Sequence, residues 1–332
     1  MIALPGEYEA WGWQEGSDPL TLTRDTRPLP SPAAGEVLVQ NHAIGLNPVD
    51  WKVLGAMDSW APGHVAGVDG AGVVVALGEG VTTGWLGQRV AYHQNLLVHG
   101  SYAEFTPVRA EVLLRLPEAM DFATAAGLPC PLLTAWTALD QLPSRPGEAM
   151  LVSGAGGAVG GYIVQLATRA GWRVTAMCNA RHRERLAGLG AVDWIAGPLP
   201  DDTMWSDPRR FSAVIDSIGP DHAMRLHPAV RAKGHLVCIQ GRVAQWPSPA
   251  FGRALSLHEI ALGALHQHGD SEDWARVVTH GEVLLSDIAA GRIVAEPLVS
   301  ASFADLPQAL AGLRDRNFTG KPIVLLDGKA SQ

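Results

Sequence analysis

The sequence predicts an α/β protein in which a doubly wound parallel sheet is joined to a second, β-rich domain of barrel type. Three observations predict this fold class. An apolar run at 150–153 leads through a glycine cluster into a helical pattern and then into a second β-branched run at 174–178. Strand-like runs at 213–216 and 235–239 follow with helical stretches between them, as parallel pairing requires. The first third of the chain instead holds short strands punctuated by glycine.

Length and composition limit the class of protein. A chain of 332 residues is long enough for about two domains, each with its own core. Apolar residues make up 47% and charged residues 17%, which is typical of a globular protein. A net charge of −8 repels polyanions over most of the surface, so we expect no nucleic-acid partner.

Cysteine usage and hydropathy predict the compartment. The three cysteines, Cys130, Cys178 and Cys238, are isolated and lack the spacing of a disulfide framework or a cysteine-based zinc site. They suit a reducing compartment. The chain start has no signal-peptide pattern, and no run reaches the roughly 18 apolar residues of a membrane span. We therefore expect a cytoplasmic protein without membrane partners.

The β-rich part begins with residues 36–44, which alternate apolar and polar side chains as a half-buried strand does. Asn47 before Pro48, with Asp50 three residues after Asn47, indicates the start of a short helix. The segment 67–81 opens with small residues and continues as a β-branched strand. Such short strands predict a barrel-like domain.

The glycine cluster after the strand at 150–153 has the layout of a dinucleotide-binding turn. Backbone must approach a pyrophosphate closely there, and the helix N-terminus offers N–H groups and a positive dipole end. The strict G-x-G-x-x-G pattern is not met, because Val159 takes the third place and the glycines instead follow a G-x-x-G-x-x-G spacing. The alternative is a glycine-rich loop without a ligand. The expected pyrophosphate contacts are Gly154, Gly156, Gly157, Ala158, Val159 and Gly160.

The residues after the second strand favour NADPH over NADH. An acid in this place would accept hydrogen bonds from the ribose 2′-hydroxyl of NAD and repel a 2′-phosphate. Here Asn179, Arg181 and Arg183 follow the strand, and no acid appears before Glu184. Amide and guanidinium groups bind phosphate. The alternative is that the arginines only solvate a helix face.

Further cofactor contacts are expected at the carboxyl ends of the next two strands, where ligands of parallel sheets bind. Ser217 and Gly219 follow the strand at 213–216. Ile239 and Gly241 follow the strand at 235–239. Ser217 has the alternative role of a turn residue.

Six motifs occur in a fixed order, and together they resemble one protein family. They are Asn47-Pro48-Val49-Asp50, Gly67-Val68-Asp69-Gly70-Ala71-Gly72, Gly100-Ser101-Tyr102-Ala103-Glu104, Leu133-Thr134-Ala135-Trp136, the glycine turn, and Gly320-Lys321-Pro322-Ile323-Val324-Leu325. From about residue 10 to residue 326 the chain resembles the medium-chain dehydrogenase/reductase superfamily, and within it the zinc-independent, quinone oxidoreductase-like (zeta-crystallin-like) branch.

The resemblance implies a Rossmann domain at 127–266, inserted in a GroES-like β-barrel domain that is formed by residues 1–126 and 267–332. It implies that Asn47 and Thr134 lie near the nicotinamide. It also implies a homodimer, and an apolar edge strand near residues 257–265 agrees with that expectation.

The positions that bind zinc in metal-dependent relatives carry unsuitable residues here. By resemblance, a cysteine ligand is replaced by Asn47, and a Gly-His-Glu motif by Gly67-Val68-Asp69. An amide and an isopropyl group are poor zinc ligands. Cys130 alone does not make a tetrahedral site, and His64 is followed by a valine instead of a carboxylate. We expect no metal.

Without a metal, nothing activates a simple alcohol, whereas a quinone or an α,β-unsaturated carbonyl can accept hydride into a conjugated system. The expected activity is therefore NADPH-dependent reduction of such an acceptor. Asn47, Lys52 and Tyr92 are the candidate catalytic donors, and His93 with Asn95 lies on a loop suited to substrate contacts. The alternatives are a solvated helix residue for Lys52 and a core aromatic for Tyr92.

Two other functions stay open at this point. One is a zinc-dependent NADP alcohol dehydrogenase with unrecognised ligands. The other is a protein that binds NADPH without turnover, since an intact cofactor motif is compatible with turnover and with its absence.

Overall fold

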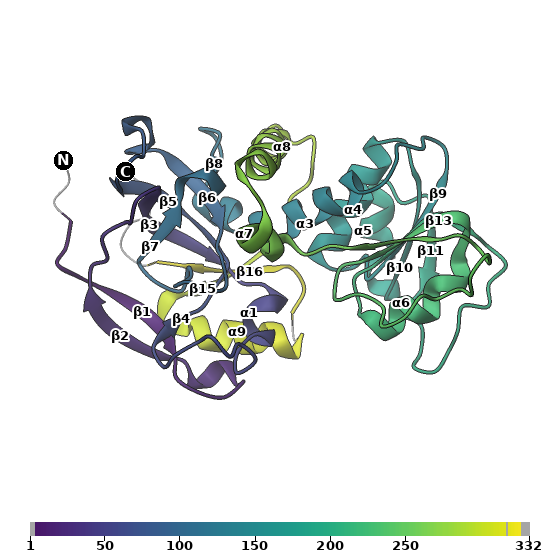
Figure 1. The fold of residues 1–332 in the computed structure, drawn as a ribbon, viewed down its shortest axis with the longest axis horizontal. Coiled ribbons are helices and arrows are strands. Elements are labelled where there is room, and N and C mark those ends of the chain that lie inside the picture. The colour runs from purple at the N-terminus through teal and green to yellow at the C-terminus, as the bar shows by residue number, and fades with distance from the viewer. Residues whose placement is uncertain (1–3, 317, 327–332) are drawn as a thin grey trace. The chain divides into compact units, whose positions relative to one another are not determined.

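The computed structural model describes residues 4–316 and 318–326. The chain forms two compact units (Figure 1): unit 1 comprises Met1–Cys130 and Gly263–Gln332, and unit 2 comprises Pro131–Leu262. Unit 2 is thus inserted between two parts of unit 1. The chain leaves unit 1 after Cys130 and returns at Gly263, whereas the sequence placed these crossings after residues 126 and 266.

Unit 1 is built on two sheets. The smaller one has the order β2-β1-β4, and the larger one has the order β15-β16-β3-β5-β6-β8 with β7 also paired to β3. Because strand β16 pairs antiparallel with β3, the two parts of unit 1 share one sheet. The strands of unit 1 are β1 (Glu7–Trp13), β2 (Thr23–Pro28), β3 (Glu36–Gly45), β4 (His64–Val65), β5 (Asp69–Leu77), β6 (Arg89–His93), β7 (Phe105–Arg109), β8 (Leu113–Arg115), β15 (Leu298–Ser302) and β16 (Lys321–Leu325).

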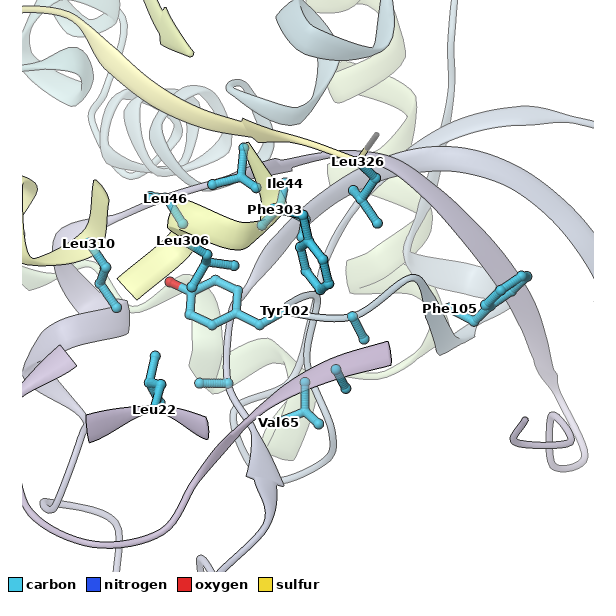
Figure 2. Close-up of a cluster of buried hydrophobic side chains, with 14 of the residues drawn as sticks. Leu22, Ile44, Leu46, Val65, Tyr102, Phe105, Phe303, Leu306, Leu310 and Leu326 are labelled. Carbon is cyan, nitrogen blue, oxygen red and sulfur yellow. The ribbon is translucent and has the colours of Figure 1, made fainter. Parts of the chain in front are cut away.

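The helices of unit 1 are short except for α8, whose first turn carries a capping box formed by Asp270 and Asp273. The helices are α1 (Pro48–Lys52), α2 (Phe122–Ala126), α7 (Leu265–His268), α8 (Ser271–Ala289) and α9 (Leu306–Asp315). Figure 2 shows the core, in which Leu22 and Leu46 from the N-terminal part lie in one apolar cluster with Leu306 and Leu310 of α9. Burial of apolar surface therefore joins the two parts of unit 1.

Unit 2 holds a six-stranded sheet in which every pairing is parallel. Its order is β11-β10-β9-β12-β13-β14, so β9 lies inside the sheet and the chain winds outward from it in both directions. That is the order of a doubly wound sheet, and ligands bind such sheets at the carboxyl ends of the strands where the winding reverses. The strands are β9 (Ala149–Ser153), β10 (Arg173–Cys178), β11 (Asp193–Ala196), β12 (Phe211–Asp216), β13 (Val230–Cys238) and β14 (Ser256–Glu259).

Four helices connect these strands or lead into them: α3 (Pro129–Asp140), α4 (Ala158–Arg169), α5 (Arg183–Gly188) and α6 (Pro220–Leu226). Helix α3 carries the chain from unit 1 into unit 2. All six residues of β12 are buried, as expected for a central strand covered on both faces. The edge strand that was expected near residues 257–265 is shorter in the structure, where β14 ends at Glu259.

In the part of the chain that the structure describes, no helix combines the length and the apolar character needed to cross a membrane.

Candidate functional site

The glycine turn of unit 2 joins β9 to α4, and Gly157 is the N-cap of that helix. Gly154 has φ +72°, a conformation that favours glycine. A Cβ on Gly160 would lie 2.5 Å from Ala155 Cα and 2.7 Å from the carbonyl oxygen of Gly154. Both atoms belong to backbone, so only glycine lets the helix lie this close to the turn. The arrangement is suited to hold a pyrophosphate at the helix N-terminus.

The basic segment after β10 folds back toward this turn. Asn179 caps a short helical turn by accepting the N–H of Arg181 at 3.0 Å. The guanidinium of Arg183 lies 5.4 Å from the ring centre of Trp194. Arg185, which the sequence did not single out, donates to the carbonyl of Gly156 at 2.9 Å. Because a Cβ on Gly156 would lie 2.5 Å from the His182 ring, the segment packs directly against the turn.

The turn after β12 is held by a buried carboxylate. Asp216 is 1% exposed and accepts the N–H groups of Ile218 at 3.1 Å and Gly219 at 2.9 Å. It also lies 2.6 Å from Nδ1 of His222, whose Nε2 accepts the N–H of Leu199 at 3.0 Å. The Nδ1 atom of His222 therefore carries the proton, because both nitrogens have assigned partners. The sequence singled out neither Asp216 nor His222.

Ser217 and Gly154 lie side by side. A Cβ on Gly154 would be 3.1 Å from Cβ of Ser217, so the turns after β9 and β12 meet. Ser217 Oγ is buried and makes no hydrogen bond to the described residues. A buried hydroxyl without a partner beside a glycine turn fits a polar ligand there. Gly241, after β13, has φ +100°, and the N–H of Ile239 donates to the carbonyl of Asp216 at 2.9 Å.

Unit 1 carries a buried polar cluster around Asn47, which is 2% exposed. Its side-chain Nδ2 donates to Asp69 at 2.8 Å, and its Oδ1 accepts from Nζ of Lys321 at 2.5 Å. Its backbone N–H donates to Asp50 at 2.7 Å. Asp69 also accepts the N–H of Cys130 at 3.0 Å. We call Asn47, Asp50, Asp69 and Lys321 the Asn47 cluster.

The charges of this cluster are deeply buried. Both Asp50 and Asp69 are fully buried, and Lys321 is 4% exposed. Burial raises the pKa of Asp50 to about 6 and the pKa of Asp69 to about 7, although the Lys321 ammonium acts in the opposite direction. Nζ of Lys321 lies 3.9 Å from Asp69 and donates to the carbonyl of Leu46 at 3.0 Å. The cation thus lies among the oxygens of Asn47, Asp69 and Leu46.

Within residues 4–316 and 318–326, no group of three or more His, Cys, Asp or Glu side chains is placed to hold a metal ion. In the Asn47 cluster the positive charge comes from Lys321. The side chains there offer an amide, two carboxylates and an ammonium. The ammonium of Lys321 already lies against the oxygens of Asn47 and Asp69, which a metal ion would need as ligands. This donor set does not fit zinc.

The structure places Tyr92 inside the barrel. Its ring is fully buried, and its hydroxyl donates to Oδ1 of Asn41 at 2.8 Å. Burial raises the pKa of this hydroxyl far above its usual range. Tyr92 therefore has the role of a core aromatic, which the sequence analysis gave as the alternative. A phenol that is buried, hydrogen-bonded and of raised pKa is a poor acid, so Tyr92 is not the proton donor that was expected.

Lys52 and Thr134 have different surroundings. Lys52 ends α1 on the surface, with Nζ 5.7 Å from the ring centre of Trp51. Partial burial and the charge of Arg316 lower the pKa of Lys52. Thr134 lies in α3 and is 8% exposed. The contacts expected of both residues with substrate or cofactor stay predictions.

Two buried histidines of unit 1 form a pair. Nδ1 of His93 lies 3.1 Å from Nε2 of His266, and the two residues are 5% and 7% exposed. Burial lowers both pKa values, that of His93 well below the usual value and that of His266 to about 4. His266 lies 173 positions away in the sequence, in α7, so no local pattern in the sequence connects it with His93.

The chain is similar to several characterised proteins. Residues 33–118 match the alcohol dehydrogenase GroES-like domain family. A chloroplast envelope quinone oxidoreductase homolog of Arabidopsis thaliana is 32% identical over 232 residues, which cover 66% of this chain and 70% of that protein. A chloroplastic NADPH-dependent alkenal/one oxidoreductase of the same plant is 28% identical over 340 residues, 97% of this chain and 80% of that protein. The match to quinone-oxidoreductase QR1 of Triphysaria versicolor, at 33% identity, spans only 62% of that protein and 58% of this chain.

Solved structures share the whole fold. An alcohol dehydrogenase superfamily protein from Novosphingobium aromaticivorans superposes with a TM-score of 0.82 at 26% identity, over 96% of this chain and all of that chain. The quinone oxidoreductase from Coxiella burnetii gives 0.79 at 22% identity, over 96% of this chain and 99% of that chain, and shows the fold alone.

These matches confirm the predicted fold class, a Rossmann-type parallel sheet with a GroES-like β domain. They also confirm the resemblance on which the sequence interpretation relied. The chain is an oxidoreductase that belongs to the medium-chain dehydrogenase/reductase superfamily, in its quinone oxidoreductase-like branch.

Proposed function

We propose that this protein transfers hydride from NADPH to a quinone or an α,β-unsaturated carbonyl, without a metal ion. The observation that carries the proposal is the Asn47 cluster. By resemblance, Asn47 stands where metal-dependent relatives have a cysteine ligand of zinc, and here Lys321 donates to Asn47 at 2.5 Å and lies 3.9 Å from Asp69. A simple alcohol would need an activating Lewis acid, whereas a conjugated acceptor does not.

Unit 2 supports the cofactor part of the proposal. Bound NADPH supplies the hydride. The glycine turn would hold the pyrophosphate, with Gly154, Gly156, Gly157, Ala158, Val159 and Gly160 as the contacts. Ser217 offers a buried hydroxyl that lacks a partner among the described residues, and Asp216 fixes the backbone of Gly219 beside it. Ile239, Gly241 and Thr134 complete the proposed set.

The preference for NADPH is proposed from Asn179, Arg181 and Arg183. Arg181 and Arg183 are both exposed at the carboxyl end of β10, and no carboxylate stands between them and Cys178. The stacking of Arg183 on Trp194 holds one guanidinium in place at 5.4 Å, which reduces the entropy lost when it binds phosphate. Arg185 shapes the turn itself through Gly156.

Unit 1 would bind the acceptor and stabilise the negative charge that develops on its oxygen. The amide of Asn47 is held by Asp69 and Lys321, so its position is fixed before any ligand binds. We propose Asn47 as the residue that orients the acceptor beside the nicotinamide, and Lys52, at the end of α1, as a polar contact at the surface.

The assembly and compartment are further proposals. Strand β14 ends the parallel sheet of unit 2, and Leu257 lies within it. An edge strand of this kind favours pairing with a second copy, so we propose a homodimer. The isolated cysteines fit a reducing compartment such as the cytoplasm.

The test is NADPH oxidation followed by absorbance with a panel of quinones and enones, each with and without a chelator. We expect turnover that resists the chelator and that falls in Asn47→Ala. Loss of activity in the chelator would instead support the zinc-dependent alcohol dehydrogenase. NADPH binding without oxidation by any acceptor would support the binding protein without turnover. The control is Gln14→Ala, because Gln14 bonds to Thr23 at the exposed edge of unit 1.

A further inference from the structure

We propose that His93 and His266 form a proton relay, in which His93 delivers the proton that follows hydride transfer. This inference rests on the proposed reductase function and names the proton donor of that site. It replaces Tyr92, whose hydroxyl is bonded to Asn41 inside the barrel.

The first argument is position. His93 is the last residue of β6 and stands directly opposite Asp69 of β5 in the antiparallel ladder. Residues directly opposite each other in such a ladder place their side chains on the same face of the sheet. His93 therefore shares a face with Asp69, which holds Asn47 at 2.8 Å. The proposed orienting residue and the proposed proton donor thus lie in one region of unit 1.

The second argument is the geometry of the pair. The Nδ1 to Nε2 distance of 3.1 Å is that of a hydrogen bond, and the rings are inclined by only 16°. Trp274 of α8 packs against His266 with ring centres 4.7 Å apart, which holds the second ring in place. Both residues are more than nine-tenths buried, so water competes little for the shared proton.

The third argument concerns the charge state. Two cations act on the pair: Lys321 on β16 lowers the pKa of His93, and Arg109 on β7 lowers the pKa of His266. Asp69 stands opposite His93 on β5. Burial and both cations disfavour an imidazolium, so both rings are neutral near pH 7. Two neutral imidazoles hold two N–H protons between them. One lies in the shared hydrogen bond, and the other lies on the outer ring nitrogen of His93 or on that of His266.

That property makes a relay. In one arrangement His93 carries its proton on Nε2, and its Nδ1 accepts a hydrogen bond from the Nε2–H of His266. When the Nε2–H bond of His93 breaks and a C–H or O–H bond forms on the enolate or hydroquinone anion, the shared proton moves to Nδ1 of His93. In the same step Nδ1 of His266 takes a proton from a water molecule, which leaves as hydroxide, so both rings stay neutral. The reverse tautomer shift restores the Nε2–H of His93 before the next turnover. One proton is consumed for each hydride, which balances the reduction of the acceptor by NADPH.

The competing role is a purely structural pair, and the chain offers a matched control. His235 and His258 in unit 2 also form a pair, with Nδ1 3.0 Å from Nε2 and His235 8% exposed. They lie on β13 and β14 and belong to none of the proposed cofactor or acceptor contacts. His235→Gln therefore measures what the loss of a partly buried histidine pair does to the protein in general.

The experiment compares His93→Gln, His266→Gln and His235→Gln in the full-length protein, with one enone and one quinone. We expect kcat to fall on the order of 10²-fold in His93→Gln and less in His266→Gln, while the Kd for NADPH is unchanged. His235→Gln is expected to retain the activity of the unaltered protein. Added imidazole should restore part of the activity of His93→Ala, a result that a structural role would not produce.

Retention of kcat within about threefold in a folded His93→Gln protein would overturn the relay while leaving the reductase function intact. Absence of rescue in a folded His93→Ala protein that binds NADPH would overturn it as well. If the unaltered protein binds NADPH and reduces none of the acceptors, the proposed function fails first and the relay falls with it. Circular dichroism of each variant identifies any loss caused by unfolding.

Discussion

The two units of this protein build their candidate sites in opposite ways. In unit 2 the turn between β9 and α4 is shaped by backbone, and Gly154 and Gly160 are needed because a Cβ would be strained or would meet neighbouring backbone atoms. In unit 1 the site consists of buried side chains, with Asn47, Asp69 and Lys321 brought together from three separate parts of the chain. The first kind of site is local in sequence and the second is not.

The comparison also concerns energy. A backbone turn costs little beyond the conformational freedom of its glycines. In a buried cluster of two carboxylates and an ammonium, every charge loses its hydration. Ion pairing and hydrogen bonds within the cluster offset that loss only while all partners are present. Removing one member from unit 1 should therefore destabilise the protein more than adding one methyl group to the turn of unit 2.

The largest effect is expected for Lys321→Met. The change keeps the apolar stem but removes the ammonium, which leaves Asp69 buried without its cation and the oxygens of Asn47 and Leu46 without a donor. At a pH above 7, where Asp69 is ionised, breaking a buried charge pair costs about 3–5 kcal/mol of unfolding free energy. Denaturant unfolding measures this loss.

Lys52→Met is the matched control, because Lys52 is exposed at the end of α1 and lies over Trp51. We expect it to change the unfolding free energy by less than about 1 kcal/mol. Equal losses in the two variants would contradict the view that the Asn47 cluster holds unit 1 together.

A smaller loss is expected for Gly160→Ala in unit 2. The new Cβ would lie 2.5 Å from Ala155 Cα and must displace backbone, so α4 shifts away from the turn. We expect a loss of about 1–3 kcal/mol in unfolding free energy, together with weaker NADPH binding. Thermal unfolding and a fluorescence titration with NADPH measure the two effects.

Gly188→Ala is the control for this change. Gly188 ends α5, and a Cβ there would have no atom within 4 Å. Since alanine favours helix over glycine, this variant should be neutral or more stable by up to about 1 kcal/mol. Loss of NADPH binding in Gly188→Ala as well would show that the turn is not specifically sensitive to the space at Gly160.

The same contrast explains what the sequence predicted. The first strand, turn, helix and second strand of unit 2 appear as a contiguous pattern of apolar residues and glycines, so the turn was recognised locally. The later strand-like runs at 213–216 and 235–239 then indicated the parallel sheet. The boundaries were less accurate: β14 ends at Glu259, whereas the edge strand was expected near residues 257–265. Tertiary context decides where an edge strand ends, and the sequence does not carry that information locally.

The side-chain sites were predicted less well, for a physical reason. Asp50 has the sequence position of a helix cap, and it does accept the N–H of Asn47, but its complete burial depends on the whole barrel. Lys321 begins β16 and enters the cluster only because β16 pairs with β3. Tyr92 was selected as a polar group near a loop, whereas the register of β6 against β5 and β8 places it inside the barrel.

The pH dependence of stability should distinguish the cluster from the rest of the protein. The folded state raises the pKa of Asp69 from 3.8 to about 7, so between these values the folded state binds more protons than the unfolded state. The unfolding free energy contributed by Asp69 is therefore greatest below about pH 4 and falls as the pH rises toward 7. Asp69→Asn removes this contribution, and its stability should fall less steeply with pH.

Asp50 acts in the same direction, because burial raises its pKa to about 6, so part of the slope should remain in Asp69→Asn. Urea unfolding at several pH values between 4 and 8 measures both slopes. The control is Asp58→Asn, at an exposed position outside the cluster, which should keep the slope of the unaltered protein. An unchanged slope in Asp69→Asn would show that Asp69 is ionised throughout this range.

The smallest effect is expected for Arg181→Ala, which changes an exposed side chain beside the turn of unit 2. An exposed guanidinium contributes about 0.5–1 kcal/mol to an ionic contact, so the KM for NADPH should rise roughly two- to fivefold. The KM for NADH should stay the same, because NADH lacks the 2′-phosphate. The control is Arg173→Ala, since Arg173 is exposed at the opposite end of β10. If both KM values rise together in Arg181→Ala, the arginine supports the turn that holds either cofactor, and the preference for NADPH must come from Asn179 or Arg183.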